Sequence, residues 1–363
     1  MTSLGVVNSH AKLSVVGGGV IGLSVAWRAA RLGWQVTVHD PAPGRGASWV
    51  AGGMLTPLSE GWPGEDRLLD LGLASLKLWP AFAQMLDPSI VSARGALTVA
   101  LDAADVADLL RIAQWLQSRG QHIDVLDRAG VRTVEPVVSR AVRLGLYSPD
   151  ELSVDNRALV AALQSAALAA GVEFRSETVT DLDALDADQV VLAAGVNSHQ
   201  LCPQLPVRAV KGEILRLRSR AGSLPGPATT IRARVHGRPV YLVPRGDGLV
   251  VGATQYESAD TQVTVAGVRD LISDAEAVFP AIGDFELYET SAGLRPMTPD
   301  NMPLIGRVDD RVIAATGHGR GGILLTPITV EGVLAALTDR EPESSAAAAL
   351  QTADPSRCAG VTT

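Results

Sequence analysis

The hydrophobic and polar positions of residues 13–40 follow the pattern of a strand, a helix and a second strand. An apolar run is followed by a glycine turn and then by a stretch whose apolar residues recur at helical spacing. A second short run of strand type ends at Asp40. All of this fits within about 30 residues, the length of one parallel βαβ unit. The pattern therefore predicts two parallel strands joined by a helix at the start of the fold.

The turn between the first strand and the helix has the glycine spacing of a dinucleotide-binding loop. Gly17 permits a tight turn, Gly19 lets the backbone approach a pyrophosphate, and Gly22 lets the helix pack closely on the strand. The phosphates then lie at the helix N-terminus, where unpaired N–H groups and the helix dipole favour negative charge. Asp40 can accept hydrogen bonds from both ribose hydroxyls of an adenosine, and its charge would repel a 2′-phosphate. NADP is therefore disfavoured, while NAD and FAD remain; a glycine turn that only serves packing is the alternative.

Further helices and strands are indicated by the same periodicities. Residues 188–198 form a continuous apolar run that ends in a glycine turn, as expected of a parallel strand buried on both faces that returns to the first sheet. Asp155 caps a predicted helix that runs to about Ala170. The other predicted elements are helices at about 65–86, 103–119 and 265–279 and a strand at 96–101.

The segment 207–255 has a different character from the rest of the chain. Four short runs in it alternate apolar and polar residues: VKGEILRLRS, ATTIRARV, PVYLVP and GLVVGAT. This alternation is typical of an antiparallel sheet with one face in water. Residues 310–337 then repeat the order of strand, glycine-rich turn and helix, which predicts that the chain rejoins its first domain.

Together these elements predict an α/β fold of two domains. The first is a discontinuous, doubly wound, Rossmann-like domain that binds the dinucleotide, and the second contains a mixed or antiparallel sheet. A chain of 363 residues exceeds the usual size of one hydrophobic core, in agreement with this division. The expected boundaries are 10–90, 150–207 and 293–340 for the first domain, 91–149 and 208–292 for the second, and 341–363 for a disordered tail without apolar period.

Composition narrows the possible partners. The chain has 31 basic and 39 acidic residues without a long run of either sign, so a nucleic-acid partner is not indicated. The longest apolar stretch, around 13–27, is shorter than the roughly 20 residues that span a bilayer, and the N-terminus does not have the pattern of a secretory signal. We therefore expect no membrane span and a cytoplasmic location. Cys202 and Cys358 are expected to be free thiols, and the six histidines have no metal-ligand spacing, so no metal site is expected.

Beyond these patterns, nearly the whole chain resembles the FAD-dependent amino-acid oxidases of the D-amino-acid oxidase type, and among them the glycine oxidases of thiazole (thiamine) biosynthesis. Each of the matching motifs is weak by itself, but the set is specific. The motifs are GGGVIG at 17–22, Asp40, AGGML at 51–55, VLAAG at 191–195, VKGE at 210–213, YLVPR at 241–245, VVGAT at 250–254, AGLRP at 292–296 and GHGRGGILLTP at 317–327.

The resemblance implies that the dinucleotide is non-covalently bound FAD and that the second domain covers its ring system. A short set of residues, Gly319, Gly321, Gly322 and Ile323, would lie along the pyrimidine edge of the ring. Backbone N–H groups there would stabilise the negative charge that develops when the flavin is reduced. The remaining residues that the resemblance places against FAD are Gly17, Gly19, Val20, Ile21, Gly22, Asp40, Ala47, Ser48, Gly53, Met54, Val179 and Gly195.

Three residues are candidates for the substrate site. Arg295 lies in an otherwise small and apolar strand end, where the carboxylate of an amino acid would give its guanidinium a partner; an internal salt bridge is the alternative. Tyr241 can direct its hydroxyl at the same carboxylate, or it can serve packing. Arg320, in GHGRGG, is a further candidate near the carboxylate or the flavin, with a surface role as the alternative. His318 is interpreted as structural.

The implied reaction is oxidative deamination of a small amino acid by hydride transfer to flavin N5, with O2 as the acceptor that yields hydrogen peroxide. The resemblance also implies thiazole synthase as a candidate partner and a homo-oligomeric assembly. Gln255 and Pro239 depart from the residues expected in glycine oxidases, so the preferred amine stays open. The alternatives are an oxidase or dehydrogenase of the same family that acts on D-amino acids, sarcosine or proline, and a dinucleotide-binding module without catalysis.

Overall fold

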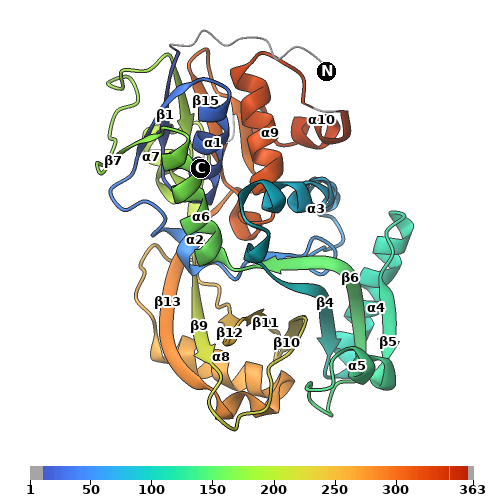
Figure 1. Cartoon of the computed structure of the whole chain (residues 1–363). Helices are drawn as coiled ribbons and strands as arrows, with labels where there is room; N and C mark the ends of the chain where they lie inside the picture. Colours follow the sequence, from blue (N-terminus) through green and yellow to red (C-terminus); the bar gives the residue numbers. More distant parts are fainter. Residues whose placement is uncertain (1–10, 343, 359–363) are drawn as a thin grey trace.

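The computed structural model describes residues 11–342 and 344–358. Its strands form two sheets, one in each half of the molecule (Figure 1). The half at the top of Figure 1 contains the first sheet with its helices, and the half at the bottom contains the second, larger sheet. No helix among the described residues is long and apolar enough to cross a membrane.

The first sheet has six strands in the order β14-β15-β8-β1-β2-β7. All neighbours pair in parallel except β14 and β15. The predicted strand at 188–198 is β8, and it pairs with β1 as expected. Segments far apart in the sequence therefore meet in one sheet. The strand bounds are β1 Lys12–Val16, β2 Gln35–His39, β7 Glu173–Arg175, β8 Gln189–Leu192, β14 Leu304–Arg307 and β15 Val312–Thr316.

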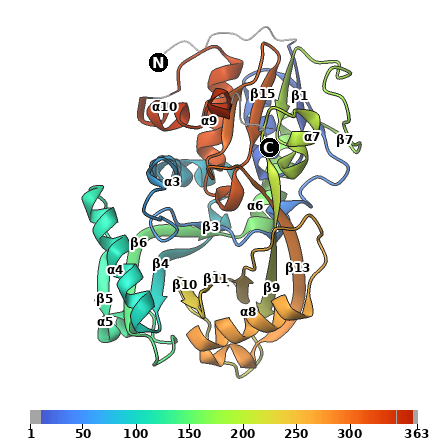
Figure 2. The same ribbon diagram turned by 180° about the vertical axis from the view of Figure 1, so that it is seen from behind.

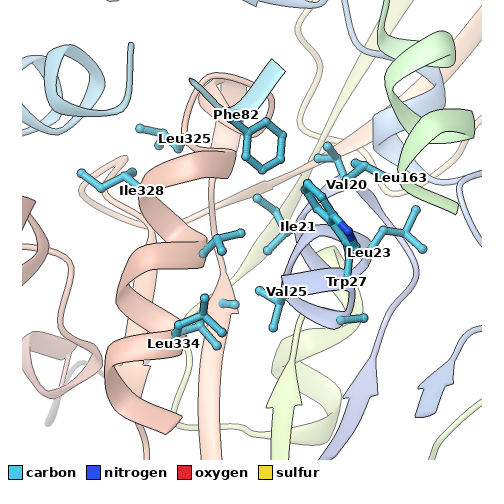
Figure 3. Close-up of a cluster of buried hydrophobic side chains, with 14 of the residues drawn as sticks. Val20, Ile21, Leu23, Val25, Trp27, Phe82, Leu163, Leu325, Ile328 and Leu334 are labelled. Carbon is cyan, nitrogen blue, oxygen red and sulfur yellow. The ribbon is translucent and has the colours of Figure 1, made fainter. Parts of the chain in front are cut away.

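Helices pack on this sheet and form the largest core of the molecule. Figure 3 shows its centre, where Trp27 of α1 meets Phe82 of α3, with ring centroids 5.9 Å apart. Leucine, isoleucine and valine side chains from α1, α6 and α9, together with Leu325 just before α9, surround this pair, and each contributes about 1.5–3 kcal/mol by its burial. The helices are α1 Val20–Arg31, α3 Asp66–Leu86, α6 Asn156–Ala169, α7 Ser198–Leu201 and α9 Thr326–Leu337.

The second sheet follows the order β13-β9-β12-β11-β10-β4-β6-β3, and β5 pairs with β6. It is antiparallel except where β10 pairs with β4, and α8 covers one of its faces with a second core. Segment 207–255 supplies β9 to β12, which pair in antiparallel fashion as the alternation predicted, and the parallel pair of β10 with β4 makes the whole sheet mixed. The expected face in water is wrong for β9, which is buried from Val210 to Leu217 on both faces. Its strands are β3 Met54–Leu55, β4 Val91–Ala100, β5 Asp124–Asp127, β6 Leu144–Val154, β9 Arg208–Arg218, β10 Thr230–Val235, β11 Arg238–Arg245, β12 Gly248–Gly252 and β13 Glu286–Met297.

Three helices accompany the second sheet, and a fourth lies where the chain passes between the halves. They are α4 Ala103–Ser118, α5 Arg128–Val134, α8 Val265–Val278 and the short α2 Ala47–Val50. Strands β3 and β4 and helix α2 show that the chain crosses between the two sheets several times. The residue boundaries of the two domains stay a prediction.

The expected disordered tail at 341–363 is wrong for residues 344–358. Helix α10, Ser344–Gln351, lies beside α3 and α9 (Figure 2). Leu350 and Ala353 are buried, and the Ile305 N–H donates to the Ala353 carbonyl at 2.9 Å. Arg357 then pairs with Asp300 at 3.0 Å. This segment is too short and too rich in alanine to show an apolar period, but its few apolar residues pack on the core. Residues 343 and 359–363 of the predicted tail lie outside the described part.

Candidate active site

The glycine turn after β1 has no room for side chains. A Cβ built at Gly22 would lie 1.9 Å from the carbonyl oxygen of Gly17, and one at Gly17 would lie 2.3 Å from the Ala193 carbonyl oxygen. Gly17 also has a positive φ of 107°, which side chains disfavour. By contrast, a Cβ at Gly19 would meet only the Ser48 hydroxyl, at 3.2 Å. The turn is therefore tightly packed against β8 and open at the start of α1.

The side chains of Asp40 and Ser48 accept hydrogen bonds from backbone N–H groups in and beside this turn. The Asp40 carboxylate accepts from the Gly18 N–H and the Ala42 N–H, both at 2.7 Å, one on each oxygen. Each oxygen keeps a second lone pair, so the carboxylate can still accept from ribose hydroxyls. Ser48 accepts from the Val20 N–H at 3.0 Å. The remaining first-turn N–H groups of α1 are the donors that a phosphate needs.

The other predicted cofactor residues lie on loops near the same edge of the first sheet. Gly17, Asp40, Gly195 and Gly319 each follow within three residues of the end of a strand, namely β1, β2, β8 and β15. Because these strands run parallel, their carboxyl ends share one edge, which is where doubly wound sheets bind nucleotides. Ile21 and Ile323 are buried beside this edge, and Val179 packs against the apolar cluster that contains Val190 and Leu192.

The segment from α2 to β3 is fixed by residues of both halves. Asn156, fully buried, donates to the carbonyl oxygens of Ser48 and Trp49 at 2.8 and 2.9 Å. Arg245 of β11 donates to the Gly52 carbonyl at 2.5 Å, and burial lowers the pKa of its guanidinium to about 10. Ala47, Gly53 and Met54 belong to this segment, and a Cβ at Gly53 would lie 2.1 Å from the Val154 carbonyl oxygen. The segment is thus a rigid link between the cradle and the second sheet.

The glycine-rich turn after β15 adopts a short 3-10 helix at Gly319–Gly321, followed by Gly322. His318 precedes it and is buried, with its Nε2 2.9 Å from the Thr329 hydroxyl. Burial lowers the pKa of His318 to about 3, so the ring is neutral at physiological pH. A buried, neutral ring bonded to a helix hydroxyl is consistent with the structural role that the sequence indicated.

These features fit a bound dinucleotide. The open helix start, the carboxylate at the end of β2 and the small residues after β8 and β15 share one edge of the sheet, and side chains are excluded from the turn itself. The residues that would hold the cofactor are therefore present in a suitable arrangement.

Arg295 and Tyr241 lie on the same face of the second sheet. Strand register carries this face from β13 through Gly212 of β9 and Gly252 of β12 to Tyr241 of β11. A Cβ at Gly212 would lie 2.3 Å from the Arg295 guanidinium, and one at Gly252 would lie 2.3 Å from the Tyr241 hydroxyl. The two glycines therefore let both side chains lie flat over the sheet and point toward each other's strands.

Arg295 has no carboxylate within 4.0 Å among residues 11–342 and 344–358, so the alternative of an internal salt bridge is wrong within that part. One guanidinium nitrogen donates to the carbonyl oxygens of Thr254 at 3.2 Å and Lys211 at 3.4 Å. The other N–H groups are left for an anion, because a guanidinium has five N–H donors. A half-buried cation without a counter-ion is an electrostatic site for a carboxylate.

The Tyr241 hydroxyl has no hydrogen-bond partner in the part of the chain that the structure describes. Burial raises the pKa of Tyr241, and the nearby Arg295 opposes that rise. The phenol therefore keeps its proton at neutral pH and can donate it in a hydrogen bond. The ring also lies beside Gly52, where a Cβ would be 2.9 Å from it, so Tyr241 borders the segment that leads to Gly53 and Met54.

Arg320, the third substrate-site candidate, has its partners in the loop that contains Glu60 and Glu65. Its guanidinium pairs with Glu65 and is 3.4 Å from the Glu60 carbonyl oxygen. It lines a hollow with Glu60, His318 and Met297, and 35% of its side chain is exposed. No hydrogen bond or ion pair joins it to Arg295 or Tyr241 among the described residues, although the 3-10 helix that carries it contacts β13. Pro239 and Gln255 are both exposed.

Sequence reasoning missed an acidic loop that closes this region, residues 57–65. Glu60 pairs with Arg232 of β10 at 2.8 Å, and Arg232 is the strand partner of Tyr241. The fully buried Glu151 of β6 accepts from the Leu58 N–H at 2.6 Å, from the Ser59 N–H at 3.1 Å and from the Ser59 hydroxyl. Burial raises the pKa of Glu151 to about 7. The alternation of arginines in TIRARV is the only sequence signal that points to this cluster.

Comparisons with known proteins identify the family. The family model described as DAO, FAD dependent oxidoreductase, matches residues 12–336. The putative thiamine biosynthesis oxidoreductase ThiO of Rhizobium etli is 34% identical over 320 residues, which cover 87% of this chain and 93% of that protein. A glycine oxidase of Geobacillus kaustophilus is 31% identical, with 87% of this chain and 90% of the relative covered.

Two further matches extend this result. The bifunctional protein ThiO/ThiG of Synechocystis sp. is 36% identical over 87% of this chain, which spans 50% of that protein. The crystal structure of glycine oxidase from Geobacillus kaustophilus superposes with a TM-score of 0.85 and 29% identity, covering 92% of this chain and 96% of the other. The predicted α/β fold class, the resemblance and the FAD dependence are confirmed. This chain belongs to the DAO family of FAD-dependent oxidoreductases.

Proposed function

We propose that this chain oxidises glycine to the imine while O2 is reduced to hydrogen peroxide. The imine either hydrolyses to glyoxylate and ammonia or passes to a partner enzyme. One observation carries the proposal: Arg295, without a carboxylate partner in the described part, and the unbonded Tyr241 hydroxyl share a sheet face that borders the cofactor segment. Relatives named glycine oxidase and thiamine biosynthesis oxidoreductase support the choice of substrate.

In this proposal, Arg295 and Tyr241 have separate roles in binding the substrate. Arg295 binds the substrate carboxylate with its free N–H groups, and Tyr241 donates its hydroxyl proton to the same group. FAD, when bound, would supply the acceptor for the hydride of the substrate α-carbon. Fixing the carboxylate aligns the α-carbon, and such positioning accounts for much of the rate when no protein base is needed. The substrate amine reacts in its neutral form, so that its lone pair forms the C=N bond as hydride leaves.

The same relatives indicate where the product goes. Because the Synechocystis relative is named as a bifunctional ThiO/ThiG protein, we infer that the imine passes to thiazole synthase in thiamine biosynthesis. We also expect a homo-oligomer. Both statements concern this chain's partners and need tests of their own, by co-purification with thiazole synthase and by light scattering.

The decisive test is a spectrum of the purified protein, followed by anaerobic addition of glycine. A yellow protein whose flavin bleaches with glycine, and which releases peroxide in air, agrees with the proposal. D-alanine, sarcosine and D-proline are measured in parallel, because the exposed Pro239 and Gln255 leave the pocket without the residues expected in glycine oxidases. Bleaching by one of these and not by glycine would replace the proposed substrate, and bleaching without peroxide would indicate a dehydrogenase.

A further inference from the structure

The ion pair of Glu60 and Arg232 lies on the side of Tyr241 opposite to Arg295. Register pairs Arg232 of β10 directly with Tyr241 of β11, so both side chains project from the same sheet face. Arg295 approaches Tyr241 from β13 by way of the bare backbone at Gly212. The Tyr241 hydroxyl thus lies between Arg295 on one side and the Glu60 carboxylate on the other. Arg295 has no carboxylate partner among the described residues.

Only one oxygen of the Glu60 carboxylate contacts a cation of the chain. Its Oε1 forms an ion pair with Nη1 of Arg232 at 2.8 Å, without the geometry of a hydrogen bond, and Oε2 has no partner among the described residues. The side chain is only 12% exposed, and Glu60 lines the hollow beside Gly321 and Met297. Oε2 is not among the buried oxygens without a partner, so it keeps access to solvent and a ligand can reach it. A charge-assisted hydrogen bond to such an oxygen gains about 1.5–3 kcal/mol.

The position of Glu60 is fixed from both sides. Glu151 holds the backbone of Leu58 and Ser59, immediately before Glu60. Arg320 donates to the Glu60 carbonyl at 3.4 Å and pairs with Glu65 at the end of the loop. Glu60 also acts on the Tyr241 hydroxyl: its negative charge raises the pKa of Tyr241, whereas Arg295 lowers it. Glu60 and Arg295 are therefore both within electrostatic range of one hydroxyl.

We propose that Glu60 binds the amino group of the substrate and that Arg232 is a positioning residue that holds the Glu60 carboxylate. Resting on the proposed function, this gives the site a complementary charge for each end of an α-amino acid. Either an ammonium or a neutral amine donates N–H to the free oxygen, so the contact persists when the amine loses its proton. Glu60 then selects amines over carboxylic acids of the same size.

The test compares a substrate that has an amine with a ligand that has none. In the FAD-containing holoenzyme, Glu60→Gln is expected to raise the KM for glycine by about tenfold or more, the equivalent of about 1.4 kcal/mol. The dissociation constant of acetate, read from flavin absorbance, is expected to stay equal or to fall, because Arg232 is then uncompensated. Glu60→Asp is expected to recover part of the loss. Asp70→Asn, an exposed acid on α3 that pairs with Arg119, is the matched control and should change neither value.

The double variant Glu60→Gln/Arg232→Gln separates contact from charge balance. If the effect came only from repulsion by the freed Arg232, the double variant would restore the KM for glycine, which would overturn the proposal. An unchanged KM in Glu60→Gln, or acetate weakened as much as glycine, would overturn it as well. If the wild type does not oxidise glycine, the proposed function fails, but the dissociation constants of glycine and acetate still test Glu60; a wild type that binds acetate and no amino acid rules the contact out.

Discussion

The cofactor cradle and the substrate-facing side of the second sheet are built in opposite ways. The cradle depends on side chains that are missing: at Gly17 and Gly22 one extra carbon would collide with backbone oxygens. The substrate face depends on charged and polar side chains from separate strands, with Arg295, Tyr241 and Arg232 on β13, β11 and β10. Gly17 and Gly22 have no room for an added carbon, whereas the substrate face can exchange one side chain at a time. Substrate preference is therefore expected to vary within the family more readily than FAD binding.

The largest effect is expected at the cradle. Gly22→Ala places a methyl group 1.9 Å from the Gly17 carbonyl oxygen, so either α1 or the turn must move. We expect loss of most bound FAD, measured as the ratio of flavin to protein absorbance, and a lower Tm. Gly46→Ala is the control, because a Cβ there has nothing within 4 Å. Full FAD content in Gly22→Ala would show that the packing of the turn is not what sets cofactor binding.

The next effect is expected at the anion site. Arg295→Ala removes the free guanidinium donors and should raise the KM for glycine by about 10- to 150-fold, the equivalent of about 1.5–3 kcal/mol. FAD content should stay normal, because the residue lies outside the cradle. Steady-state kinetics with peroxide detection measure the change, and Arg295→Lys should recover part of it. A KM within twofold of the wild type would remove Arg295 from the substrate site.

The buried acid under the loop gives a pH-dependent effect on stability. Glu151 has its pKa raised from 4.5 to about 7 by burial, so the folded state keeps a proton that the unfolded state has lost between these values. Wild-type stability is therefore expected to fall as pH rises from about 4.5 to 7, by about 3 kcal/mol for a pKa change of about 2.5 at about 1.36 kcal/mol per pKa unit, and then to level off. Glu151→Gln cannot ionise, so its Tm should gain on the wild type across this range. Parallel Tm curves for the two proteins would contradict the shift.

The smallest effect is expected at Arg320. Its pairing with Glu65 satisfies the charge within the chain, so Arg320→Ala should raise the KM for glycine by less than Arg295→Ala does. Both variants are compared in the same assay, with Glu65→Gln as a second way to break the pair. A KM increase as large as that of Arg295→Ala would show that Arg320 leaves Glu65 to bind substrate.

The sequence predicted the βαβ unit that forms the cradle because the parts of this unit are contiguous. Glycine spacing, helix period and the acid at position 40 all lie within one βαβ unit, and local sterics decide its shape. The substrate face depends on strand register, so the convergence of Tyr241 and Arg295 over Gly212 and Gly252 could be expected only from the resemblance.

Other features escaped sequence reasoning for physical reasons of the same kind. The ion pair of Glu60 and Arg232 joins a loop to a strand about 170 residues away in sequence. A local sequence pattern cannot predict a partner that is so distant along the chain. Glu151 stands in the polar run SPDELS, which gives no sign of a fully buried acid. The C-terminal helix was missed because tertiary packing of Leu350 and Ala353, and not helical period, orders it.

The ring of Tyr241 lies between Gly52, in the segment that precedes β3, and Gly252, in the second sheet. One aromatic side chain thus touches both halves of the molecule at the place where they meet. If the substrate carboxylate shifts this ring, it also alters how FAD fits, and FAD in turn affects the binding of the carboxylate. Such thermodynamic coupling acts equally in both directions. Carboxylate ligands are accordingly expected to strengthen the equilibrium binding of FAD by the same free energy with which FAD strengthens their binding.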